Sequence, residues 1–200
     1  MTAGTGSTPL LIVGLGNLLC SDDGVGVRAA VAITRHHRLP AGVRVLDGGT
    51  LGLQLLGELA EAETVLLVDA VRVDSPPGTV VVLDGEEVAN AVRDRLSVHQ
   101  VGVADLLGAL GLIGRAPRLL RLVGVVPKSL ELGVDCSPEV EAALPALVRR
   151  VVEEARAVGF DLPRYNRRDP AAAFPSGETS DEPQGSASSL EPRARLALGL

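Results

Sequence analysis

Two adjacent aspartates, Asp22 and Asp23, follow a short apolar run and a glycine-containing turn near the start of the chain. The apolar run, residues 10–14, predicts a buried strand, and the apolar spacing after Gly24 predicts a helix. The sequence therefore places two carboxylates in a loop between a strand and a helix. Ser21 or one of the aspartates is expected to cap the helix. A second carboxylate then remains for a metal cation or for acid–base chemistry.

Two further aspartates stand at the ends of predicted strands. Asp47 follows residues 43–46, and Asp69 follows the apolar run 64–68. Ligands of α/β proteins bind outside the carboxyl ends of the strands, so we expect both acids at the edge that carries Asp23. An aspartate in such a place is seldom fully buried unless it is paired. The alternative for Asp69 is a structural role, in which its carboxylate accepts backbone hydrogen bonds from the following turn.

His99 is the most informative of the three histidines. It belongs to the sequence Ser-Val-His-Gln at 97–100, which has the form of a capping box and predicts a helix over 97–112. The positive end of the helix dipole favours a neutral imidazole there, and a neutral imidazole is the form that binds metals. The alternative is a polar residue bonded to the backbone. His36 and His37 lie between two arginines and are expected at a solvated helix end.

Asp23, Asp69 and His99 together would supply two oxygen ligands and one nitrogen ligand. This set suits a borderline divalent ion such as nickel or zinc and leaves positions open for water or an incoming ligand. Cys20 stands beside the first loop. It is either a soft ligand, a reactive thiol or a small buried apolar side chain, and the last interpretation is favoured.

The pair Gly14 and Gly16 after a predicted strand also invites a dinucleotide-binding interpretation. The third glycine of that fingerprint is missing, because its position holds Leu19. The two aspartates stand where the pyrophosphate would bind, and like charges repel. The loop therefore favours a cation over a nucleotide.

The apolar segments of the chain predict an α/β fold with a mostly parallel sheet and helices on both faces. Strands are expected over 10–14, 43–46, 64–68, 79–83 and 119–126, and helices over 24–37, 51–60, 97–112 and 138–158. The strand over 79–83 follows its predecessor too closely for a helical crossover, so we expect it to be antiparallel. Residues 1–160 are expected to form a single domain, and the Pro-, Ser- and charge-rich residues 161–200 a disordered tail.

Composition excludes several classes of function. The net charge is −6 and aromatic residues make up only 2%, so nucleic-acid binding is not expected. No apolar run approaches the roughly 20 residues that span a bilayer, and no positive charge precedes the first apolar run as in a signal peptide. The two cysteines form no CxxC motif, which indicates reduced thiols in a cytoplasmic protein.

Five ordered motifs give the chain a resemblance to a known family. They are GLGNLLCSDDGVGVRA, LDGGTLGLQLLGEL, VLLVDAV, SVHQVGVADLL and LVGVVPKSLELGVDCSPEVEAALP. In this order and spacing, residues 10–158 resemble the hydrogenase maturation endopeptidases, which act on the large subunit of nickel–iron hydrogenases. The resemblance implies an α/β/α sandwich around a five-stranded sheet. It also implies a peptidase of the aspartic-type grouping that removes a C-terminal extension from the nickel-loaded precursor.

The resemblance assigns the metal-binding positions to Asp23, Asp69 and His99. Many members have Glu where this chain has Asp23, and Asp47 matches another acid of the family pattern. These ligands would contact nickel that the substrate's cysteines hold, so nickel is expected to arrive with the substrate, although zinc or another divalent ion could occupy the site. Asp23 is our first choice as general base, with Asp69 as the second catalytic candidate. The alternative function is a nickel-binding maturation chaperone that does not cut.

Overall fold

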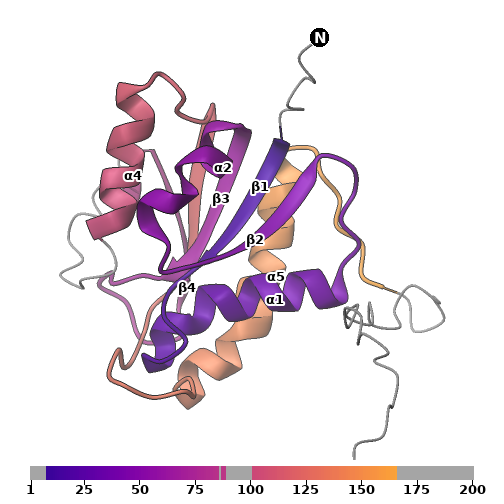
Figure 1. Cartoon of the computed structure of the whole chain (residues 1–200). Coiled ribbons are helices and arrows are strands. Elements are labelled where there is room, and N and C mark those ends of the chain that lie inside the picture. The colour runs from indigo at the N-terminus through magenta and orange to yellow at the C-terminus, as the bar shows by residue number, and fades with distance from the viewer. Residues whose placement is uncertain (1–7, 86, 89–100, 166–200) are drawn as a thin grey trace, which may run out of the picture. The chain divides into compact units, whose positions relative to one another are not determined.

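The computed structural model describes residues 8–85, 87–88 and 101–165, without the side chains of 101–104. Figure 1 shows a sheet with helices packed on both of its faces. The strands are β1 (Thr8–Leu15), β2 (Val43–Gly49), β3 (Ala62–Ala70), β4 (Val80–Asp84) and β5 (Leu119–Val125). The helices are α1 (Val25–His36), α2 (Leu56–Ala60), α4 (Val101–Leu112) and α5 (Pro138–Ala157), with 3₁₀ turns η1 (Ser21–Gly24) and η2 (Gly52–Leu55).

The sheet has five strands in the order β2-β1-β3-β5-β4. All neighbouring pairs are parallel except β4 and β5, which are antiparallel. This confirms the predicted mostly parallel sheet and the antiparallel strand near residues 79–83. Gly14 of β1 pairs with Asp47 of β2 on one side and with Val68 of β3 on the other. The carboxyl ends of three strands therefore lie level at one edge.

The apolar strand runs are buried on both faces of the sheet. Successive side chains of a strand point to opposite faces, so Ile12 packs with α1 and α5 while Val13 packs with η2, α2 and α4. Each face has its own cluster of buried aliphatic side chains. This explains why the strand sequences are apolar at consecutive positions rather than at alternate ones. The predicted three-layer sandwich is confirmed.

Two strand ends differ from the sequence prediction in ways that affect the site. Asp47 and Asp69 lie within the last residues of β2 and β3, not after them. The ladder between β3 and β5 continues through Asp69 and Ala70, so backbone pairing extends the strand beyond its apolar run. The predicted start of the helix over 97–112 lies outside the described residues, and the described part begins at Val101.

The segment after α5 packs against α1 as far as Tyr165. Leu162 is only 1% exposed, and its carbonyl oxygen lies 2.7 Å from Nδ1 of His37. The backbone N–H of Tyr165 donates to the carbonyl of His36 at 2.9 Å. His37 is thereby buried, which corrects the expectation of a solvated position for it. Residues 166–200 lie outside the described part, and the division into a domain and a tail stays a prediction.

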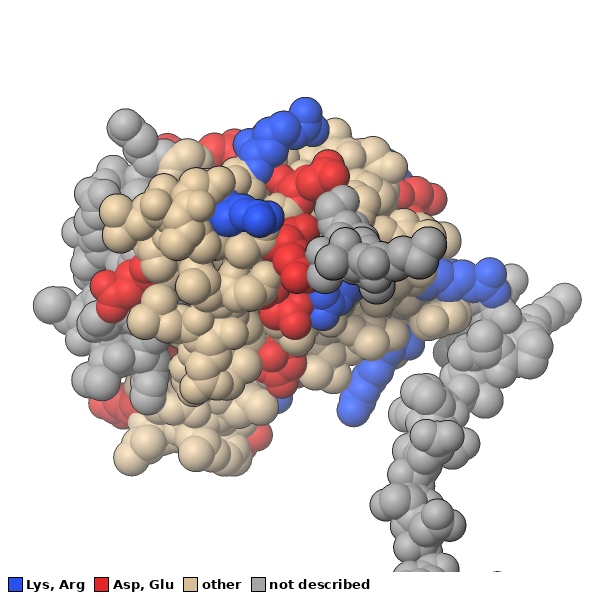
Figure 2. Space-filling model, turned by 45° about the horizontal axis from the view of Figure 1, so that its top comes forward, with Lys and Arg blue, Asp and Glu red and all other residues tan. Residues whose placement is uncertain are grey.

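The surface in Figure 2 is acidic rather than basic. Asp and Glu side chains gather in a band across this view, with Lys and Arg side chains scattered around it. The net charge of −6 agrees with this distribution. Among the described helices, none has both the length and the apolar character needed to cross a membrane.

Leu162→Ala should destabilise the fold by about 2–4 kcal/mol, because it opens a cavity under a side chain that is fully packed. Urea unfolding followed by circular dichroism measures this loss. Leu112→Ala is the matched control, since Leu112 is 91% exposed and its truncation should leave the unfolding free energy nearly unchanged. Equal effects of the two substitutions would contradict the packing of residues 161–165 on α1.

Candidate functional site

The first turn of α1 sits directly on the carboxyl ends of β1 and β3. Gly26 makes this possible, because a Cβ there would lie 2.1 Å from the carbonyl oxygen of Val68 and 2.4 Å from that of Leu15. The turn η1, which precedes α1, contacts β3. Asp23 in η1 and Asp69 near the end of β3 thus both belong to the edge formed by the carboxyl ends of the strands.

The Asp23 side chain is buried and held by the preceding loop. It is 5% exposed, and its Oδ2 accepts a hydrogen bond from the backbone N–H of Asn17 at 2.8 Å. The loop can fold back over η1 because Gly16 has a φ of 117° and a Cβ there would lie 1.7 Å from the carbonyl oxygen of Asp23. Neither η1 nor α1 has a side-chain cap, so the expectation that Ser21 or an aspartate caps the helix is wrong. The 3₁₀ turn η1 occupies the segment directly before α1, where a capping residue would otherwise stand.

The Asp69 carboxylate is also buried, with 3% exposure. Its Oδ1 accepts a hydrogen bond from the backbone N–H of Ala70 at 2.7 Å. The structural role considered for Asp69 therefore accounts for one of its contacts. The same residue occupies the strand end at which a ligand site is expected, and that ligand role stays a prediction.

His99 lies outside the described residues, and its convergence with Asp23 and Asp69 stays a prediction. Within the part of the chain that is described, no three His, Cys, Asp or Glu side chains gather as a metal site requires. The direction of α4 is informative nevertheless. This helix ends at Leu112 and leads to the start of β5, which lies at the edge opposite Asp69. The start of α4 consequently lies toward the edge that carries Asp23 and Asp69 (Figure 1).

Asp22 has a different set of partners from its neighbour. Its side chain is fully buried, and its two oxygens accept four hydrogen bonds from the loop between β5 and α5. The donors are the backbone N–H groups of Lys128 (2.8 Å), Ser129 (3.0 Å) and Ser137 (2.6 Å), and the Ser137 hydroxyl (2.9 Å). Burial by itself would raise the pKa of Asp22, but these hydrogen bonds outweigh it and lower the pKa below its ordinary value. Asp22 therefore anchors a loop as a carboxylate.

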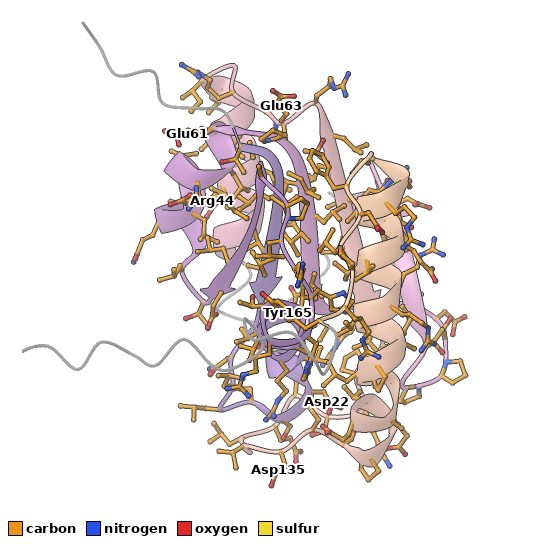
Figure 3. The ribbon with its side chains drawn as sticks, turned by 90° about the vertical axis from the view of Figure 1, so that its right-hand side faces the viewer. Asp22, Arg44, Glu61, Glu63, Asp135 and Tyr165 are labelled. Carbon is orange, nitrogen blue, oxygen red and sulfur yellow. The ribbon has the colours of Figure 1, made fainter. Side chains whose placement is uncertain are left out.

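Figure 3 places Asp22 at the end of the molecule opposite Glu61 and Glu63, which stand near the start of β3. Asp47, the remaining acid of the predicted set, is exposed, and its Oδ1 accepts a hydrogen bond from the backbone N–H of Gly49 at 3.0 Å. Asp47 lies at the same edge of the sheet as Asp23 and Asp69, but it is exposed whereas they are buried.

The two cysteines near the site are free thiols, Cys20 and Cys136, and both are half-buried. Burial raises the pKa of the Cys136 thiol above its ordinary value, so this residue stays protonated near neutral pH. A protonated thiol is a poor metal ligand. For Cys136 this favours a packing role over a ligand role, and the interpretation of Cys20 stays a prediction.

Comparisons with known proteins point to one family. Residues 27–154 match a family model described as hydrogenase maturation protease; this stretch includes Asp69 and His99 and begins after Asp23. The hydrogenase 2 maturation protease of Escherichia coli (strain K12) is 40% identical over 157 residues, which cover 78% of this chain and 96% of that protein. The hydrogenase expression/formation protein HupM of Azotobacter chroococcum is 36% identical over 197 residues, covering 98% of this chain and 86% of that protein.

Solved structures show the same likeness. The hydrogenase maturating endopeptidase HybD from Escherichia coli superposes with a TM-score of 0.75 and 38% identity, covering 78% of this chain and 97% of that one. The nickel–iron hydrogenase maturation protease HybD from Thermococcus kodakarensis gives a TM-score of 0.61 and 31% identity, covering 74% and 99%.

Asp22→Asn should cost about 2–3 kcal/mol of unfolding free energy, because it removes a charge and sets an amide N–H₂ against N–H donors. The lowered pKa of Asp22 also predicts a pH dependence. Its stabilisation is present above the unfolded-state pKa of about 4 and is lost as pH falls through the lower folded-state pKa. Urea unfolding at a series of pH values should show a steeper acid loss for the natural chain than for the variant.

Asp135→Asn provides the control, since Asp135 is an exposed aspartate of the same loop. It should change the unfolding free energy little at neutral pH. An Asp22→Asn chain as stable as the Asp135→Asn chain would contradict the anchoring role of Asp22.

Proposed function

Because this chain belongs to the hydrogenase maturation protease family, we propose that it is an endopeptidase that removes a C-terminal extension from the nickel-loaded precursor of a nickel–iron hydrogenase large subunit. The observation that carries the proposal is the pair of buried carboxylates, Asp23 and Asp69, at one edge of the sheet. The aspartic-type grouping and a cytoplasmic location are part of the proposal.

The proposed metal-sensing site consists of Asp23, Asp69 and His99. Two carboxylate oxygens and one imidazole nitrogen fit a borderline divalent ion, and the direction of α4 supports the placement of His99 with the two acids. Nickel reaches this site as part of the substrate, where the substrate's cysteines hold it; zinc or another divalent ion can take its place. A set of two carboxylates and one imidazole leaves positions open for the cysteine thiolates of the substrate, which suits a site that tests whether the precursor has been loaded.

The proposed general base is Asp23. Its carboxylate would accept a proton from a water molecule as that water attacks the carbonyl carbon of the scissile bond. The hydrogen bond from the backbone of Asn17 fixes the orientation of the carboxylate before the substrate arrives. Asp69 is held in the same way by the N–H of Ala70 and supplies the second carboxylate.

Asp23→Asn, Asp69→Asn and His99→Ala should each leave the fold intact and slow processing by about 100-fold or more, because each removes a ligand or the base. The measurement is the mass of the nickel-loaded precursor before and after incubation with the purified chain. Asp161→Asn is the control, since Asp161 follows α5, is exposed and pairs with Arg156 in the last turn of that helix. Processing at the natural rate by all three site variants would refute the assignment of these residues.

Nickel-free precursor should keep its full length under the same conditions, because the site would then have no ion to recognise. The comparison also separates the enzyme from its alternative. A chain that binds the loaded precursor without shortening it is a nickel-binding chaperone and not a peptidase.

A further inference from the structure

Four large apolar side chains are exposed to solvent beside the candidate site. Leu18 and Leu19 precede η1 and are 44% and 62% exposed, whereas Leu132 and Val134 belong to the loop after β5 and are 87% and 62% exposed. We call these four residues the apolar ribbon. Single exposed apolar residues are ordinary on a protein surface, but a group of them beside a functional site marks a binding surface.

Backbone hydrogen bonds join the two halves of the apolar ribbon. The N–H of Gly133 donates to the carbonyl of Leu19 at 3.0 Å, and the N–H of Ser21 donates to the carbonyl of Gly133 at 2.7 Å. Together they form a parallel bridge between Cys20 and Gly133. In this register Leu19 stands opposite Leu132. Leu19 and Leu132, which come from segments far apart in the sequence, thus present one apolar surface.

The backbone of the apolar ribbon is held by polar contacts. The Asp22 carboxylate binds both ends of the loop that carries Leu132, and the Arg28 guanidinium donates to the carbonyl of Val134. These contacts fix the backbone before any partner binds. A partner would therefore gain the burial of the leucine side chains at a small cost in backbone ordering.

The apolar ribbon lies next to Asp23, the proposed general base, and this position indicates which molecule binds there. Leu19 stands four residues before Asp23 in the same loop, so the two positions are separated by little more than one turn of backbone. A polypeptide whose scissile bond lies at Asp23 must pass over the neighbouring surface. The exposed Leu112 offers no such position, because it ends α4 at the opposite edge of the sheet.

We propose that the apolar ribbon is a docking surface for an apolar stretch of the hydrogenase large-subunit precursor next to its cleaved bond. This inference rests on the proposed function and adds to it the residues that select the substrate. The apolar ribbon lowers the dissociation constant of the precursor, whereas Asp23, Asp69 and His99 act on the bond and the metal. Affinity and cleavage are consequently supplied by separate residues.

Leu19→Ser, Leu132→Ser and the double variant test the proposal in the full chain. The double variant should bind the nickel-loaded precursor about tenfold or more weakly, since two leucine side chains lose their burial in the complex. Titration calorimetry measures the dissociation constant. In the processing assay KM should rise while kcat stays near its natural value. Leu112→Ser is the matched control and should change neither quantity, and circular dichroism verifies that each variant is folded.

The outcomes separate this inference from the proposed function. A double variant that binds as tightly as the natural chain overturns the docking surface. If the natural chain binds the precursor but does not shorten it, the proposed function fails, and the binding comparison still decides the docking surface. If the natural chain does not bind the precursor at all, the precursor is the wrong occupant. The same conclusion follows if the double substitution leaves precursor binding unchanged and alters only the mass that the chain shows by itself in sedimentation.

Discussion

The buried carboxylate of Asp22 is the constraint on which the candidate site depends. It joins the loop after the first strand to the loop after the last one, and it accepts the N–H of Ser137 at the start of α5. A buried charge is expensive unless it is fully hydrogen-bonded, and four donors meet that requirement here. The position of Asp23 and the shape of the apolar ribbon both follow from the loop geometry that this carboxylate holds.

The neighbouring aspartates have different surroundings because they lie in a 3₁₀ turn. Three residues per turn direct successive side chains about 120° apart, so adjacent residues cannot face the same surroundings. Asp22 points into the loop after β5, whereas Asp23 is held by Asn17 beside the strand ends. One side chain therefore anchors a loop, and the next supplies the proposed catalytic carboxylate. A single aspartate in this turn could not supply both.

Local patterns in the sequence were enough to predict the architecture. Consecutive apolar residues predict strands covered on both faces, and the short connection before β4 predicts its antiparallel direction. The gathering of Asp23 and Asp69 follows from the rule that parallel strands end at one edge. The partners of Asp22 were not predictable, because they lie 106–115 residues away and leave no local signal. Likewise, the burial of His37 depends on Leu162, in a segment whose composition is typical of a tail.

The long sequence separation between Asp22 and its donors affects the order in which a newly made chain can fold. Ribosomes add about 5–20 residues per second, so Asp22 leaves the ribosome several seconds before Ser137 is even synthesised. During that interval the first strand and helix can form, but their loop lacks the partners that fix it. The geometry of this loop is therefore completed only when the last strand and the start of α5 have joined the sheet.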